Sequence, residues 1–155
     1  MWALAFAFVV IQHSTADPEL LAQVLRDRSA DEQTKQQAAL DLGCLGGDRA
    51  VRYLETALRG AGPDTRASIA LALGNTRSRL AVPVLITMFA DDSARDEVCD
   101  ALVTLTHRTR CDGGDDDAAL RRAWRRWWSQ MKSSVKIHGP DTCEAGVRAN
   151  LSAGR

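Results

Sequence analysis

Little in this sequence favours a β-rich or disordered chain. Only 5% of its 155 residues are aromatic, it contains four prolines, and its acidic and basic residues balance at a formal charge of zero. Apolar residues make up 45%, and Ala, Leu and Arg are abundant, which is typical of a helical domain. The neutral balance predicts no long-range attraction to nucleic acid or anionic lipid, so any such binding would have to be local. The length fits roughly one domain with its own core.

Catalytic motifs are also missing. The sequence contains no GxSxG, no GxxxxGK[ST] and no HExxH segment. The glycines of "GCLGGD" end an expected helix rather than open one after a strand, so they do not form a phosphate-binding loop. Acidic pairs such as Asp91–Asp92 and Asp96–Glu97 fall at expected helix starts, where they act as caps. We therefore expect no catalytic residue, no cofactor site and, on balance, no enzyme.

The N-terminal segment 1–16 follows a different pattern from the rest. "WALAFAFVVI" is continuously apolar and is followed by small residues before Asp17, which is typical of a signal peptide cut after Ala16. It is shorter than the roughly twenty apolar residues of a membrane-spanning helix. This segment therefore predicts an exported or periplasmic protein. The alternative, since Met1 is followed by no nearby Lys or Arg, is a buried N-terminal helix in a cytoplasmic protein.

The four cysteines are even in number, as expected of disulfides in an exported chain. Cys44 and Cys99 fall beside Ala and Leu in expected helices, where a free thiol acts as a small buried hydrophobe. Cys111 and Cys143 flank the last expected helix, so a bridge between them would hold the tail against the domain.

A zinc site is the alternative use of these residues. His107, Cys111, His138 and Cys143 are suitable ligand types. However, their spacing lacks the paired CxxC pattern that makes such an assignment specific. We expect no metal site.

The clearest feature of the sequence is an internal repeat. "ALDLGCLGGDRAVRYL" at 39–54 returns as "ALALGNTRSRLAVPVL" at 70–85, so that Gly43 recurs as Gly74 and Leu54 as Leu85, a spacing of 31 residues. A third, partial copy begins at "SARDEVCDALVTLTH". A short repeat made of two helices indicates an α-solenoid, because no unit can bury its apolar face without its neighbour.

Helix boundaries follow from capping and periodicity. Asp17 and Pro18 begin a first helix, and Ser29 or Asp31 caps a second that ends at Gly46–Gly47. Asp48 is expected to cap a third. The expected buried positions of the second and third helices are Ala38, Ala39, Leu42, Leu45, Val51, Leu54 and Leu58.

From Pro18 to His107 the chain resembles the short HEAT-like repeats of phycobilin lyase subunits and of many bacterial HEAT repeat proteins. The resemblance lies in "ALDLG" and "LALG", in "AVRYL" and "AVPVL" with its early Pro83, and in basic residues near the start of each first helix, namely Lys35, Arg66 and Arg95. It implies an all-α solenoid of about two and a half helix pairs. It also implies a lyase or cofactor-attachment subunit as one function, although no catalytic residue of those lyases can be placed on this chain.

The repeats are followed by "RCDGGDDDAALRRAWRRWWSQMK", which predicts a Trp-rich helix that caps the solenoid. Leu120, Trp124, Trp127, Trp128 and Met131 share one face of this helix, and Asp115–Asp117 suit its N-terminus. The alternative is a nucleic-acid or membrane patch, because Arg pairs with phosphates and Trp stacks on bases or enters a lipid interface. That patch would consist of Arg121, Trp124, Arg125, Trp127 and Trp128.

The prediction from sequence is thus a solenoid over residues 17–132, followed by a flexible tail at 133–155, that serves as a scaffold for another protein. Exposed residues at repeat starts are the expected contacts for an acidic partner. We single out Lys35, Arg49, Arg66 and Arg95, whose alternative role is in local ion pairs. A lyase-like subunit and a nucleic-acid binder are the other two hypotheses.

Overall fold

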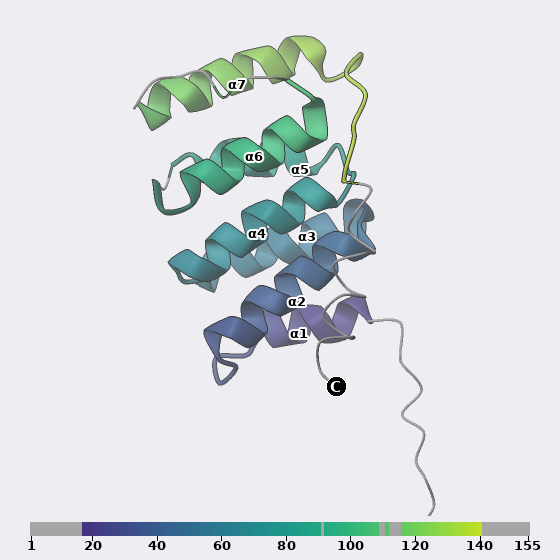
Figure 1. The fold of residues 1–155 in the computed structure, drawn as a ribbon, viewed down its shortest axis with the longest axis vertical. Coiled ribbons are helices and arrows are strands. Elements are labelled where there is room, and N and C mark those ends of the chain that lie inside the picture. Colours follow the sequence, from purple (N-terminus) through teal and green to yellow (C-terminus); the bar gives the residue numbers. More distant parts are fainter. Residues whose placement is uncertain (1–16, 91, 109–110, 112–115, 141–155) are drawn as a thin grey trace, which may run out of the picture.

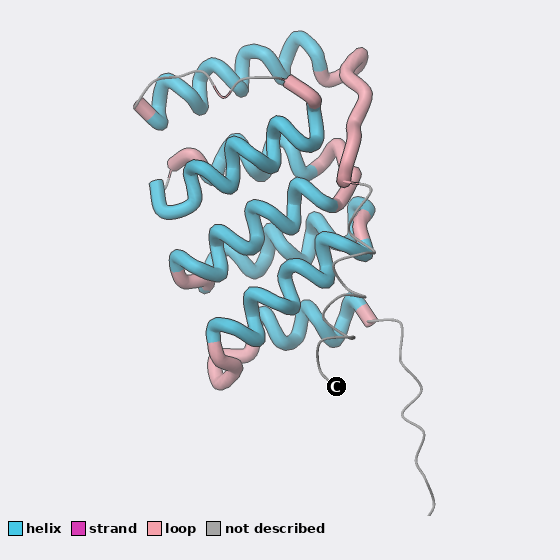
Figure 2. Tube along the Cα trace, in the orientation of Figure 1, coloured by secondary structure: helices cyan, strands magenta, loops and turns pink. Residues whose placement is uncertain are grey.

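The computed structural model describes residues 17–90, 92–108, 111 and 116–140. Within these ranges the regular structure is helical, without a strand (Figures 1 and 2). The α-helices are α1 (Pro18–Arg26), α2 (Glu32–Leu45), α3 (Gly47–Ala57), α4 (Pro63–Asn75), α5 (Ala81–Met88), α6 (Arg95–Thr106) and α7 (Asp117–Met131). Short 3-10 turns at Leu58–Gly60 and Asp92–Ala94 follow α3 and precede α6. No helix in the described part of the chain is both long and apolar enough to cross a bilayer.

The helices form two layers of an α-solenoid. α2, α4 and α6 pack side by side in one layer, and α1, α3, α5 and α7 follow one another in the second (Figure 1). α7 packs against α5 at the end of the stack, so the expected capping helix also serves as the second helix of a third pair. The predicted fold class is confirmed.

Capping explains where several helices begin. In three helices the side chain of the N-cap aspartate accepts a hydrogen bond from a backbone amide of the first turn. Asp17 accepts from Glu19, Asp31 from Thr34, and Asp116 from both Ala118 and Ala119. Each bond satisfies an amide that has no partner within its helix. Asp31, rather than Ser29, is therefore the cap of α2.

The α2–α3 turn differs from the prediction. Gly46, with φ of 73°, is the N-cap of α3, and Asp48 lies inside the helix. The Asp48 carboxylate instead accepts a hydrogen bond of 2.5 Å from Ser78 Oγ, and the Gly47 amide donates to the Thr76 carbonyl at 2.7 Å. These bonds join the turn of one helix pair to the turn of the next, so Asp48 stabilises stacking rather than helix initiation.

The core follows the repeat. Leu54 and Leu85, one repeat apart, are both 0% exposed. Leu45 was predicted to be buried and Met131 to lie on the apolar face of the last helix, but they are 47% and 38% exposed. Each is the last residue of its helix. Periodicity predicts the face on which a residue lies but not whether another element covers it.

The cysteines pair differently from the prediction. Cys99 of α6 is bonded to Cys111, with their Cα atoms 5.6 Å apart, so the predicted Cys111–Cys143 bridge is wrong. Cys143 lies outside the described residues. Cys44, expected like Cys99 to be a free thiol, is disulfide-bonded too, and none of the described cysteines is free. The Cys99–Cys111 pairing depends on the chain returning to α6 after that helix ends, which sequence spacing cannot show.

Residues 133–140, here called the C-terminal segment, were predicted to belong to a flexible tail. Instead they pack against the helix ends, with Ile137 against the core. The bonds that hold the segment are Arg79 Nη2 to the Val135 carbonyl (2.8 Å), Arg77 Nη2 to the Pro140 carbonyl (2.9 Å) and the His138 amide to the Leu105 carbonyl (2.9 Å). Two arginines of the α4–α5 turn thus hold a segment more than fifty residues away in sequence. The predicted signal peptide and residues 141–155 lie outside the described residues.

Candidate interaction site

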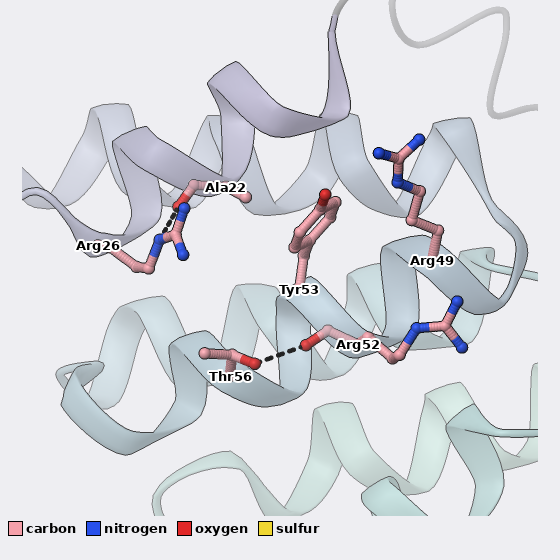
Figure 3. Close-up of a pocket in the computed structure, with 6 residues that line it drawn as sticks. All are labelled: Ala22, Arg26, Arg49, Arg52, Tyr53 and Thr56. Atoms are coloured by element: carbon pink, nitrogen blue, oxygen red, sulfur yellow. Dashed lines mark hydrogen bonds between the residues drawn. The ribbon is translucent and has the colours of Figure 1, made fainter.

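A cavity of about 320 Å³ opens between α1 and α3 in the second layer (Figure 3). Tyr53 points from α3 toward α1, and the Arg26 and Arg49 side chains lie on either side of it. The cavity combines three guanidinium groups, one phenol and one hydroxyl. Its lining residues are Ala22, Arg26, Arg49, Arg52, Tyr53 and Thr56.

The local structure explains this grouping. Three of the lining residues follow Arg49 by three, four and seven positions, so all four share one face of α3. They are Arg52, Tyr53 and Thr56. Arg26 is the last residue of α1, where a positive charge is favoured by the helix dipole. Its Nε donates to the Ala22 carbonyl at 3.1 Å, which orients the guanidinium toward α3.

Glu19 is the carboxylate at this cavity. It pairs with the Arg49 guanidinium and accepts a hydrogen bond of 2.7 Å from the Tyr53 hydroxyl. The Arg49 guanidinium also lies over the Tyr53 ring, 5.9 Å from its centroid. The Arg49 and Glu19 side chains are 63% and 40% exposed, so water screens their attraction. Arg26 and Arg52 form no ion pair with any residue that the structure describes.

A second hollow of about 220 Å³ has Arg26 and Thr56 in its lining, as the first has. Its other lining residues are Leu25, Asp27, Arg28, Lys35, Ala57 and Gly60. Hydrogen bonds from the Ser29 hydroxyl and amide lower the pKa of the Asp27 carboxyl from its usual value, so Asp27 is already occupied within its own turn. We call these two hollows, with the residues that line them, the α1–α3 groove.

The four residues predicted to contact a partner do not form one surface. Arg49 and Lys35 lie in different hollows of the groove, whereas Arg66 and Arg95 make contacts within the solenoid. The contacts are Lys35 with Glu32 (3.8 Å), Arg66 Nη1 with the Leu58 carbonyl (3.1 Å) and Arg95 Nε with Asp117 (3.1 Å). Arg66 and Arg95 therefore make local contacts, which is the alternative role that the sequence suggested for them.

Sequence reasoning missed Arg26, Arg28 and Arg52. Arg52 could have been found, because it lies three residues after Arg49 on the face that also carries Tyr53. Arg26 and Arg28 could not, because they come from the end of α1 and the turn after it. Their proximity to α3 is decided by helix packing alone.

The tryptophans of α7 face the solenoid. Trp124 is 1% exposed, and Trp127 and Trp128 are half-buried. The Arg108 guanidinium lies 4.9 Å from the Trp124 ring centroid and 5.3 Å from that of Trp127, and Arg79 lies 5.8 Å from that of Trp128. Because intramolecular arginines already stack on these rings, a nucleic-acid base would have to displace them.

The two arginines of the predicted patch differ in their exposure to solvent. Arg121 is half-buried, Arg125 is exposed, and the neighbouring Arg122 is 3.7 Å from the cap residue Asp116. The geometry of α7 thus supplies the apolar face that an end helix needs. Its outward side presents positive charge without an exposed aromatic surface for stacking.

Two of the four residues considered as zinc ligands, His107 and His138, lie side by side. The His107 and His138 rings stack with centroids 3.6 Å apart, while the Cys111 sulfur is held in a disulfide. Burial and the neighbouring His107 and Lys136 charges lower the pKa of His138. Across the described ranges, no three His, Cys, Asp or Glu residues group in a way that suits a metal ion.

Comparison with known families relates the chain to a repeat family. A family model described as HEAT repeats matches residues 18–105, which span α1 to α6. No curated protein and no solved structure matches the chain significantly.

Proposed function

Since the chain belongs to the HEAT repeat family, we propose that it is a non-catalytic scaffold that binds another protein. HEAT repeats commonly serve in protein interaction, because stacked helix pairs leave a long side surface free for contacts. The short repeat period supports a place among the bacterial proteins of this type. The observation that carries the proposal is the α1–α3 groove, an open surface where Arg26 and Arg52 have no acidic partner among the described residues.

The proposed scaffold works in an oxidising compartment. The Cys99–Cys111 disulfide supports this location, because disulfides persist outside the cytoplasm and are rare inside it. The apolar segment 1–16 supports it from the sequence side, as a signal peptide. A mature N-terminus at Asp17, found by mass spectrometry of protein from the periplasm or medium, would establish export. A retained Met1 in the cytosol would contradict it.

Site-specific photo-cross-linking tests the scaffold. A photo-reactive residue replaces Arg52 in the groove, or Asp100 on the exposed side of α6 in the other layer. We expect a discrete protein adduct from position 52 and a much weaker one from position 100. The absence of adducts at both positions, under conditions where a known complex cross-links in the same cells, would contradict a protein-binding role.

A further inference from the structure

We propose that the α1–α3 groove binds an extended acidic segment of the partner and that Glu19 competes with this segment in the free protein. This inference rests on the proposed function and adds the chemistry of the ligand. It concerns a set of residues, Arg26, Arg28, Arg49 and Arg52, that meet only because α1 packs along α3.

The charge of the groove differs from that of the whole chain. The protein has a formal charge of zero, yet four arginines and Lys35 line this one surface. The acids at the groove, Glu19, Asp27 and Glu32, keep their negative charges but are fewer than the five cations: Glu19 pairs with Arg49, Glu32 pairs with Lys35, and Asp27 lines the second hollow. The surface left for a ligand is therefore positive, and guanidinium groups bind carboxylates through paired, directional hydrogen bonds.

The shape of the groove favours an extended ligand. Two hollows of about 320 Å³ and 220 Å³ share Arg26 and Thr56, and the remaining cations are divided between them: Arg49 and Arg52 line the first, and Arg28 and Lys35 line the second. A compact anion would contact only one hollow. An extended peptide, rising about 3.3 Å per residue, presents alternate side chains to the surface and can engage both.

Glu19 already makes the contacts expected of a bound carboxylate. It pairs with Arg49 and accepts the Tyr53 hydroxyl hydrogen bond, at 2.7 Å. Because the Glu19 side chain is 40% exposed, an incoming acid can reach this contact and exchange with it. The Glu19 carboxylate therefore lowers affinity for an acidic segment and suppresses binding of weakly acidic chains.

Fluorescence anisotropy with a labelled oligoglutamate peptide tests the inference on the folded full chain. The Glu19→Gln substitution removes the charge but keeps an oxygen that accepts from Tyr53, so the fold is preserved. We expect it to tighten peptide binding about two- to five-fold. Arg52→Ala and Arg26→Ala should each weaken binding by a similar factor, and binding should fall with added salt.

Asp100→Asn is the matched control, because it removes one exposed negative charge from α6, outside the groove. We expect it to leave binding unchanged. An equal gain from Asp100→Asn and Glu19→Gln would overturn the inference, since net charge alone would then explain the effect. The inference would also be overturned if a single-stranded oligonucleotide bound more tightly than oligoglutamate and the Arg121→Ala/Arg125→Ala variant lost that binding.

The two proposals fail in different ways. If oligoglutamate binding is insensitive to Arg52→Ala but the partner still cross-links to position 52, the acidic-segment inference is wrong and the scaffold remains. If no partner cross-links at either position, the scaffold is wrong whatever the peptide does. An adduct at position 52 that an excess of oligoglutamate displaces supports both.

Discussion

Gly43 of α2 lies against the backbone of Ala72 in α4, so closely that a β-carbon at position 43 would be 2.5 Å from the Ala72 carbonyl oxygen. The same contact recurs one repeat later, where a β-carbon on Gly74 would be 2.9 Å from the Ala101 Cα. The repeated glycine therefore marks the point where helices of the first layer touch. It is required by the close approach of two helices and not by a turn.

Replacing this glycine should destabilise the protein. In an exposed helix Gly→Ala usually stabilises by about 0.5–1 kcal/mol, but Gly43→Ala forces α2 away from α4 and should cost about 1–3 kcal/mol. Urea unfolding followed by circular dichroism measures the difference. Gly60→Ala is the control, because a β-carbon at position 60 would meet nothing within 4 Å. Equal effects of the two substitutions would refute the close-contact explanation.

The Cys99–Cys111 disulfide should stabilise the end of the solenoid. It closes a short loop, with a sequence separation of 12, and the loop-entropy model assigns such a link about 2–3 kcal/mol. We expect the Cys99→Ala/Cys111→Ala variant to unfold at lower denaturant than the oxidised wild type. Peptide mapping without reductant should recover the two cysteines in one linked fragment, and a fragment that links Cys111 to Cys143 would contradict the structure.

The C-terminal segment should detach when Arg79 is removed. The Arg79 guanidinium donates to the carbonyls of Lys132 and Val135 and lies over the Trp128 ring. Arg79→Ala should speed amide hydrogen exchange at His138 while leaving exchange in α4 unchanged. Arg125→Ala, which removes an exposed arginine of α7, is the control. Unaltered exchange at His138 in the Arg79 variant would show that the segment is held by other contacts.

Stability should depend on pH through His138. Burial and the His107 and Lys136 charges lower its pKa below the ordinary 6.5, so the folded protein binds this proton less readily than the unfolded chain does. Neutral His138 therefore makes its full contribution to the free energy of unfolding above pH 6.5. This contribution is lost as the pH falls through 6.5 toward the lower pKa of the folded state. Denaturant midpoints of wild type and His138→Gln should converge or cross as the solution is acidified. A constant difference would contradict the shift.

The candidate site shows how far sequence reasoning reaches. Arg49 was predicted as one of the exposed residues at repeat starts and turns, and the structure places it in the lining of the groove. Arg66 and Arg95 satisfied the same rule but bond within the solenoid. A position in a repeat does not say which neighbour a long side chain will reach.

The helices, their two-helix repeat and the burial of Leu54 and Leu85 could be predicted from the amino-acid order, because capping and helical periodicity act over a few residues. The Cys99–Cys111 pairing, the packing of the C-terminal segment and the presence of Arg26 and Arg52 in one cavity could be seen only in the folded chain. These features join separate elements, and their geometry depends on the distance and angle at which helix pairs stack.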